Sequence, residues 1–339
     1  MVKRKGTVEN VAMNFWRDRK VFVTGATGLL GSWMVDELLK RRANVTCLVR
    51  DWVGGSKLVT DGNLSRCNVV RGELEDLDVV LRAINEYEID SVFHLGAQTI
   101  VGTASRSPLS TFEANIRGTW NLLEACRQCA KLVERVLVAS SDKAYGSCEH
   151  LPYKEDTPLR GRFPYDVSKA CADLISMSYF HSYTTPVAVT RCGNLFGGGD
   201  LNFNRLVPGT IRSLLKDEAP IVRSDGKYVR DYFYVADAVE AYLQLAEKLP
   251  DNFRGQDFNF GNEAPVSVLD LVHRISVEIG KPNLAPRILN QASHEVREQY
   301  LDCSKARDML GWQPKFTLEE GLREAIAWYR TWLSQDFHG

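Results

Sequence analysis

The 339-residue chain is long enough to bury a large core, and its length favours about two domains or lobes. A hydrophobic content of 44% and a charged content of 25% are ordinary for a soluble globular protein, and a formal net charge of −1 gives no general attraction to nucleic acid or an anionic membrane. No apolar run approaches the roughly 20 residues that span a bilayer. Residues 1–19 lack the apolar core of a secretory signal, and eight unevenly spaced cysteines suit free thiols. We therefore expect a cytoplasmic protein with no membrane or nucleic-acid partner.

The first organised stretch, residues 20–32, predicts a strand, a glycine turn and the start of a helix. Residues 21–23 form a short apolar run of strand length, and Gly25, Gly28 and Gly31 follow at three-residue intervals. These glycines suit a tight turn, close approach of the backbone to a diphosphate, and packing of the helix on the strand. The free N–H groups at the helix start would hold that diphosphate.

Strands then alternate with helices, which predicts right-handed crossovers and a parallel sheet of the Rossmann type. After Arg191 the chain has more turns and fewer apolar runs, which indicates a smaller C-terminal α/β lobe closing over the carboxyl edge of the sheet. We expect a dinucleotide-binding domain over 15–192, joined by about 232–258, and a substrate lobe over 193–231 and 259–339. The expected strands are 45–49, 68–70, 91–95, 135–139, 229–235 and 258–260, and the expected helices are 29–41, 76–86, 112–130, 165–183, 268–279 and 318–333.

Two pairs of side chains leave alternatives open. Arg50 and Asp51 end the second strand: a carboxylate there favours the ribose of NAD, whereas an arginine favours the 2′-phosphate of NADP. Cys126 and Cys129 form a C-x-x-C pair on a predicted helix with no second pair nearby, so helix packing is favoured and we expect no metal site.

The expected chemistry centres on the Tyr165 and Lys169 pair. They lie four residues apart on a predicted helix and therefore share one face. A lysine ammonium beside the tyrosine hydroxyl would favour the phenolate and lower the pKa of Tyr165, making it a base for a sugar hydroxyl.

The chain resembles the extended short-chain dehydrogenase/reductases, specifically the nucleotide-sugar epimerases and dehydratases. The resemblance runs from about Phe15 to Leu333. It is carried by residues 24–31, 94–98, Asn115, 165–169, 191–197, 230–232 and 310–314.

Within this group, Ser141-Asp142-Lys143 is the discriminating motif. Epimerases resemble this region but carry small, non-ionisable residues after the serine or threonine, whereas CDP-glucose 4,6-dehydratases carry Asp-Lys as here. Residues 15–16, 31–33 and 294–295 add to that similarity. The chain departs from the subfamily at Leu30, where the subfamily has lysine, and at Tyr145-Gly146, which are typical of the wider group.

The resemblance implies NAD(P), with NAD slightly favoured and tightly bound, and a nucleotide-diphosphate sugar as substrate. Tyr165 would take the C4 hydroxyl proton, Ser141 would share a hydrogen bond with that oxygen, and Asp142 and Lys143 would serve as acid and base for loss of water across C5 and C6. It implies a cofactor site of Gly25, Thr27, Gly28, Leu29, Leu30, Gly31, Arg50, Asp51, Glu73, Leu74, Leu95, Ala97, Gln98, Asn115, Ala139, Tyr165, Lys169 and Arg191. The implied substrate site is Gln98, Ser141, Asn194, Arg205, Arg223, Arg230 and His294.

Two other functions stay open from the sequence: a 4-epimerase that uses Tyr165 but not Asp142 and Lys143, and a non-catalytic NADP-sensing module. The group also pairs two helices of each subunit in a four-helix bundle, here 112–130 and 165–183. The second of these carries Leu174, Ile175, Met177 and Phe180, more apolar surface than one sheet face should need. We therefore expect a homodimer or a higher homo-oligomer.

Overall fold

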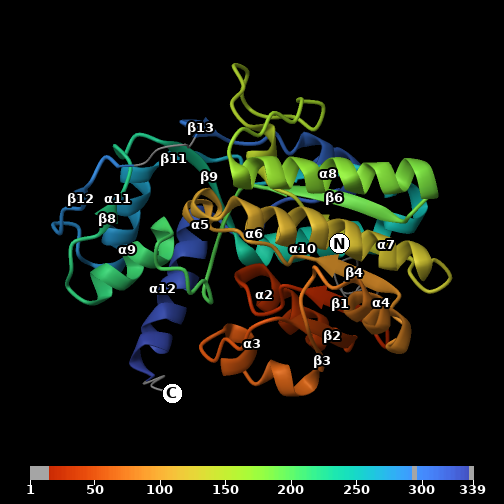
Figure 1. The fold of residues 1–339 in the computed structure, drawn as a ribbon. Coiled ribbons are helices and arrows are strands. Elements are labelled where there is room, and N and C mark those ends of the chain that lie inside the picture. The colour runs from red at the N-terminus through yellow and green to blue at the C-terminus, as the bar shows by residue number, and fades with distance from the viewer. Residues whose placement is uncertain (1–14, 292–295, 336–339) are drawn as a thin grey trace, which may run out of the picture.

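A parallel sheet lies at the centre of the computed structural model, which describes residues 15–291 and 296–335 (Figure 1). The seven strands run in the spatial order β10-β6-β5-β4-β1-β2-β3, and every neighbouring pair is parallel. The chain builds outward from β1 to β3 and then in the opposite direction from β4, so β1 and β4 form a topological switch point. The strands are Lys20–Thr24 (β1), Asn44–Val49 (β2), Asn68–Arg71 (β3), Ser91–His94 (β4), Arg135–Ala139 (β5), Val187–Cys192 (β6) and Asp257–Phe260 (β10).

The predicted Rossmann-type sheet is confirmed, with two differences at one edge. Strand β6 was not predicted, and residues 258–260, which we expected among the strands of the C-terminal part, form the edge strand β10 of the main sheet. Phe258 pairs with Thr190 of β6. The expected boundary between residues 258 and 259 thus falls inside β10. A short apolar run predicts a strand but not its partner, and pairing across more than sixty residues is decided only in the folded chain.

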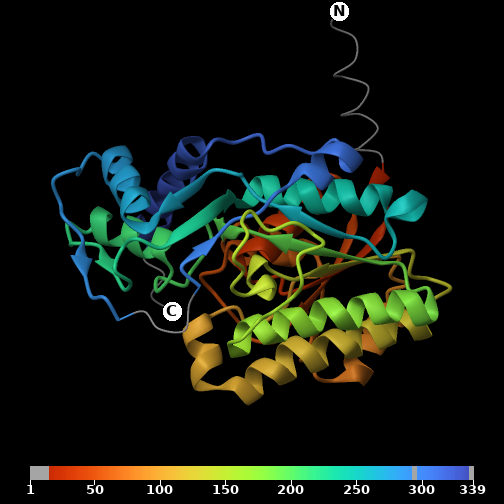
Figure 2. The ribbon, with the colours of Figure 1, turned by 90° about the horizontal axis from the view of Figure 1, so that it is seen from above.

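Two layers of helices cover the sheet (Figure 2). Helices α2 (Leu29–Lys40) and α10 (Val235–Lys248) pack on one face, and α4 (Leu77–Glu86), α7 (Gly118–Gln128) and α8 (Pro164–Tyr183) pack on the other. Strand β1 shows the alternation that this requires: Val21 and Val23 join the core under α2 and α10, whereas Phe22 joins the core under α4 and α7.

The helix expected over 112–130 is divided. Helix α6 (Pro108–Phe112) is followed by a π-helical turn, Glu113–Arg117, before α7 begins. The turn contains Asn115, one of the expected site residues, and π-turns within helices often occur at functional sites.

The C-terminal lobe is built around β9 (Val229–Tyr234), which pairs with three short strands. Strand β11 is antiparallel to β9, whereas β13 and β7 are parallel to it. The three short strands are β7 (Asn194–Phe196), β11 (Pro265–Ser267) and β13 (Glu298–Gln299). This part of the chain also contains the helices α9 (Leu206–Leu215), α11 (Val268–Ile279) and α12 (Leu318–Ser334) and the strand pair β8 (Ile221–Val222) and β12 (Arg287–Ile288). Two short helices, α3 (Lys57–Thr60) and α5 (Val101–Arg106), lie earlier in the chain, between strands of the main sheet.

One late segment returns to the first lobe. Leu301, Cys303 and Trp312 are buried in the core under α2 and α10. Among the described residues no helix is long and apolar enough to cross a membrane.

Candidate active site

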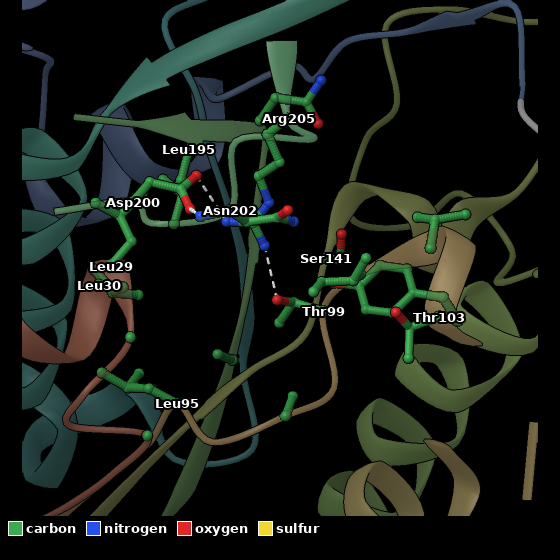
Figure 3. A pocket seen from close by; sticks show the side chains of 18 of the residues that line it. Leu29, Leu30, Leu95, Thr99, Thr103, Ser141, Leu195, Asp200, Asn202 and Arg205 are labelled. Atoms are coloured by element: carbon green, nitrogen blue, oxygen red, sulfur yellow. Dashed lines mark hydrogen bonds and ion pairs between the residues drawn. The ribbon is translucent and has the colours of Figure 1, made fainter. Parts of the chain in front are cut away.

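A cavity of about 890 Å³ lies at the carboxyl ends of the main strands, between the sheet and the C-terminal lobe (Figure 3). It brings together most of the side chains expected from the sequence. These are Gly25, Thr27, Gly28, Leu29, Leu30, Gly31, Arg50, Asp51, Leu74, Leu95, Ala97, Ala139, Ser141, Asp142, Lys143, Tyr165, Lys169, Asn194, Arg205, Arg223 and Arg230. Glu73, Gln98, Asn115 and Arg191 do not line it, and His294 lies outside the described residues.

The glycine turn between β1 and α2 forms one wall of the cavity. Gly25 has a φ of +70°, and a Cβ on Gly31 would lie 2.1 Å from the Gly25 carbonyl oxygen. Gly28 caps α2 without a side-chain hydrogen bond, so the first N–H groups of the helix are left for a ligand in the cavity. The turn therefore has the shape and the donors that a diphosphate needs.

Arg50 and Asp51 line the cavity beyond β2 and pair with each other. The Arg50 Nε donates to Asp51 Oδ2 over 2.7 Å, and both side chains are largely exposed. After the neighbouring strand β3, Glu75 lines the cavity and the expected Glu73 does not.

Asn115 acts from outside the cavity, on the loop that follows β4. Its side chain accepts a hydrogen bond from the Gln98 backbone N–H at 2.6 Å and donates to the Gln98 carbonyl at 3.0 Å. It also donates to the Ser168 hydroxyl at 2.9 Å, which ties the loop to α8. Asn115 thus joins this loop to α8 through its side chain, and direct cofactor contact by Asn115 and Gln98 stays a prediction.

Residues 141–143 follow β5 in a short helical turn, where the structure puts Asp142 and Lys143 in the same cavity as Tyr165. The Ser141 hydroxyl donates to Asp142 Oδ1 over 3.0 Å, and Asp142 is only 2% exposed. Asp142 Oδ2 is buried and has no hydrogen-bond partner in the described part of the chain. The Lys143 Nζ donates to Gln299 Oε1 at 2.8 Å. Gln299 comes from β13, and nothing in the sequence pointed to it.

Tyr165 and Lys169 both line the cavity from the first turns of α8, as their spacing predicts. Burial lowers the pKa of Lys169 to about 8, and its ammonium donates to the Ala139 carbonyl at 2.7 Å. Burial raises the pKa of Tyr165 to about 12, although a hydrogen bond with Ser141 and the charge of Arg205 act in the opposite direction. The expectation of a lowered tyrosine pKa is thus wrong for the protein alone, because burial of the phenol outweighs the neighbouring charges.

The expected arginines divide into three kinds. Arg205 reaches across the cavity: it donates to Thr99 on the first lobe at 2.7 Å and pairs with Asp200 at 2.9 Å (Figure 3). Arg223 lines the cavity and donates to Asn204 at 2.6 Å. Arg230 also lines it, but its guanidinium donates to the carbonyls of residues 296 and 297 at 2.6 and 3.0 Å.

Arg191 is buried among structural partners and does not line the cavity. Its guanidinium is 4% exposed and forms a forked ion pair with Asp173, with N–O distances of 2.7 and 3.0 Å. It also pairs with Asp257 at 2.5 Å and donates to the Tyr145 hydroxyl. Arg191 therefore joins β6, α8 and β10 behind the site.

The described residues contain no cluster of histidine, cysteine, aspartate or glutamate that could hold a metal ion. Cys126 is a residue of α7 and is buried in the core between that helix and the sheet, and Cys129, just after the helix, packs against the same core. All eight cysteines are free thiols.

Comparisons with known proteins agree with this geometry. A family model described as GDP-mannose 4,6 dehydratase matches residues 22–325. The CDP-glucose 4,6-dehydratase of Salmonella typhimurium is 31% identical over 94% of this chain and 93% of that enzyme.

Solved structures of both dehydratases and epimerases share the fold. A dTDP-glucose 4,6-dehydratase of Streptomyces venezuelae, solved with NAD bound, has a TM-score of 0.84 and 25% identity, covering 92% of this chain and 97% of that one. The UDP-glucose 4-epimerase of Thermotoga maritima, solved with UDP-glucose, has a TM-score of 0.84 and 27% identity, covering 92% and 99%. The predicted kinship with nucleotide-sugar epimerases and dehydratases is confirmed: the chain belongs to the GDP-mannose 4,6 dehydratase family.

Proposed function

We propose that this protein is an NAD-dependent nucleotide-sugar 4,6-dehydratase that acts on CDP-glucose. The observation that carries the proposal is the placement of Asp142 and Lys143 in the same cavity as Tyr165 and Lys169. An acid and a base are needed for loss of water, and they accompany the tyrosine and lysine that oxidation of a sugar hydroxyl needs. The 31% identity with a CDP-glucose 4,6-dehydratase supports CDP as the nucleotide.

The cofactor proposal rests on the glycine turn and on Arg50 and Asp51. The bare start of α2 would hold the diphosphate, and Asp51 would accept hydrogen bonds from the adenosine ribose. NAD is favoured over NADP because Arg50 is already neutralised by Asp51, whose charge would repel a 2′-phosphate. When bound, NAD would supply hydride acceptance and return for the sugar, and its positive charge would favour the phenolate of a nearby tyrosine. Because the cofactor returns to its starting state in each turnover, it need not dissociate, and we propose that it stays tightly bound.

Tyr165 and Ser141 would serve the C4 hydroxyl. The Tyr165 phenolate takes the hydroxyl proton, and the Ser141 hydroxyl shares a hydrogen bond with the same oxygen. Ser141 and Tyr165 line the same cavity, and a hydrogen bond with Ser141 acts to lower the pKa of Tyr165. Lys169, which lines the same cavity as Tyr165, would hold the cofactor ribose.

Asp142 and Lys143 would then remove water across C5 and C6. The 4-ketone acidifies the C5 hydrogen, Lys143 takes that proton, and Asp142 in its acid form protonates the departing C6 hydroxyl. One water leaves, the C6 carbon receives hydride, and C5 regains a proton, so the product is a 4-keto-6-deoxy sugar. Asp142 is buried and its Oδ2 has no hydrogen-bond partner in the described part of the chain, which leaves that oxygen for the departing hydroxyl.

The diphosphate of the substrate would lie against Arg205 and Arg223, with Asn194 beside the sugar. Arg205 donates across the cavity to Thr99 and is paired with the nearby Asp200, so substrate must replace at least the bond to Thr99 to reach the guanidinium. Arg230 would act indirectly, by holding the strand that carries Gln299.

A 4-epimerase is the second candidate, supported by the epimerase of the same fold and by Tyr145-Gly146. Incubation with CDP-, UDP-, GDP- and dTDP-glucose, followed by mass spectrometry, separates the two, since a dehydratase product is lighter by one water and an epimerase product has unchanged mass.

The Lys143→Ala variant is the sharper test. For a dehydratase we expect turnover to fall by about 10²- to 10⁴-fold, while reduced cofactor still forms on the enzyme because Tyr165 remains. Tyr165→Phe should form no reduced cofactor, and Lys131→Ala, at an exposed lysine, serves as the control. Near-normal turnover in Lys143→Ala would contradict the dehydratase and favour the epimerase.

We further propose a cytoplasmic homodimer that pairs α7 and α8 with those of a second copy. Leu174 on α8 is 61% exposed and Trp120 on α7 is 43% exposed. Ile175, Met177 and Phe180, which we had counted with this surface, pack partly buried against the core instead. The eight free thiols support the cytoplasm as the compartment.

A further inference from the structure

Gln299 is a buried neutral side chain that reaches the site from the far lobe. It is 2% exposed and lies on β13, opposite Arg230 in the parallel pairing with β9. Its Oε1 accepts a hydrogen bond from the Lys143 Nζ at 2.8 Å. Lys143 lines the cavity and Gln299 does not, so the amide holds the lysine from behind.

Tyr153 lies beside the Gln299 amide. The Tyr153 hydroxyl donates to the Gly146 carbonyl at 2.5 Å, and burial raises the pKa of Tyr153 to about 12, so that proton stays in place. A hydrogen bond with Gln299 acts on this pKa in the opposite direction. The side-chain oxygen of Gln299, the one acceptor of the amide, faces Lys143.

The segment that carries Gln299 is clamped on both sides. Arg230 donates to the carbonyls of residues 296 and 297. On the other side, the Tyr153 backbone N–H donates to the Tyr300 carbonyl at 3.0 Å, and the Asp302 N–H donates to the Tyr153 carbonyl at 2.8 Å. These hydrogen bonds fix the backbone of the segment that carries the Gln299 amide.

We propose that Gln299 is a positioning residue that holds Lys143 for proton removal and leaves it able to lose its own proton, an inference that rests on the proposed dehydratase function. A carboxylate at this position would also bind the ammonium, but it would stabilise the charged form that cannot act as a base. A neutral amide holds the nitrogen without that charge. Asp142, Cys148 and Arg230 are titratable or charged groups of the described chain that act on Tyr153 in this cluster.

The test compares Gln299→Glu and Gln299→Met with the wild type, using CDP-glucose as the probe. The readouts are the rate of water loss against pH and the absorbance of enzyme-bound reduced cofactor. In Gln299→Glu we expect the alkaline rise of the water-loss rate to move upward by about one pH unit or more, because of the added negative charge. In Gln299→Met we expect water loss to slow by roughly 10- to 100-fold while reduced cofactor builds up, because oxidation at C4 does not use Gln299.

Gln313→Glu, at an exposed glutamine, adds the same charge far from the site and should leave both readouts unchanged. An unshifted pH profile in Gln299→Glu, or unslowed water loss in Gln299→Met, would overturn the positioning role. If Gln299→Glu does not fold, the Gln299→Met rates decide the question alone. Failure of the dehydratase proposal would look different: the wild type itself would release no water, or Lys143→Ala would be fully active.

Discussion

His94 at the end of β4 should make the protein lose stability in mild acid. It is 3% exposed and lies between two threonines, with Nδ1 2.9 Å from Thr24 Oγ1 and Nε2 3.0 Å from Thr119 Oγ1. Thr24 Oγ1 accepts hydrogen bonds from the N–H groups of Leu95 and Gly96, so its own proton is directed to Nδ1. The Thr119 hydroxyl donates to the Asn115 carbonyl at 2.6 Å, so it accepts from the Nε2 proton. The site therefore fits the neutral imidazole, and Nδ1 has no acceptor for a second proton.

The magnitude follows from the pKa of His94. Burial, and to a smaller extent the charge of Lys169, lowers it from 6.5 to about 3. Below pH 6.5 the unfolded chain binds a proton here and the folded chain does not, so acid favours unfolding until the pH reaches about 3. Between pH 7 and pH 5 this one group should remove about 2 kcal/mol from the free energy of unfolding.

The assay is urea unfolding of the wild type and of His94→Gln at pH 7 and pH 5. The variant should be less stable at pH 7, because glutamine cannot reach both threonines, but its loss between the two pH values should be smaller by about 2 kcal/mol. His181→Gln, at an exposed histidine on α8, is the control. An equal pH-dependent loss in the wild type and His94→Gln would refute the assignment.

Two further predictions concern the cofactor and the assembly. Gly31→Ala places a methyl group 2.1 Å from the Gly25 carbonyl oxygen, so the turn must shift. Chromatography of the purified variant should therefore detect little or no NAD, whereas the wild type and the control Gly54→Ala, at an exposed glycine, should both retain it. Full retention of NAD in Gly31→Ala would contradict the role of the turn. Leu174→Glu should convert the dimer to a monomer in light scattering because a charge would be buried in the helix pairing, whereas Met309→Glu should not, and a monomeric wild type would reject the dimer.

The sequence alone predicted several features whose physics is local. A Cβ on Gly28 or Gly31 would meet the Gly25 carbonyl oxygen within the same turn, and the positive φ of Gly25 is also local, although Gly25 packs in addition against Leu95 and Gly96 of the loop after β4. Tyr165 and Lys169 are four residues apart on one helix, and both reach the cavity. The motif Ser141-Asp142-Lys143 predicted a dehydratase, and the family comparison supports that function.

Only the tertiary structure decided where long-range partners lie. Arg191 resembled a site residue, but Asp173 and Asp257 hold it inside the fold. Gln299 has no signal in the sequence, because its partner Lys143 is 156 positions away and meets it only through the pairing of β13 with β9. The pKa of Tyr165 likewise depends on how deeply the residue is buried, and the adjacent residues in the sequence do not determine that burial. Burial and pairing across the chain are properties of the packed molecule, whereas turns, helix faces and motif spacing are already present in the sequence.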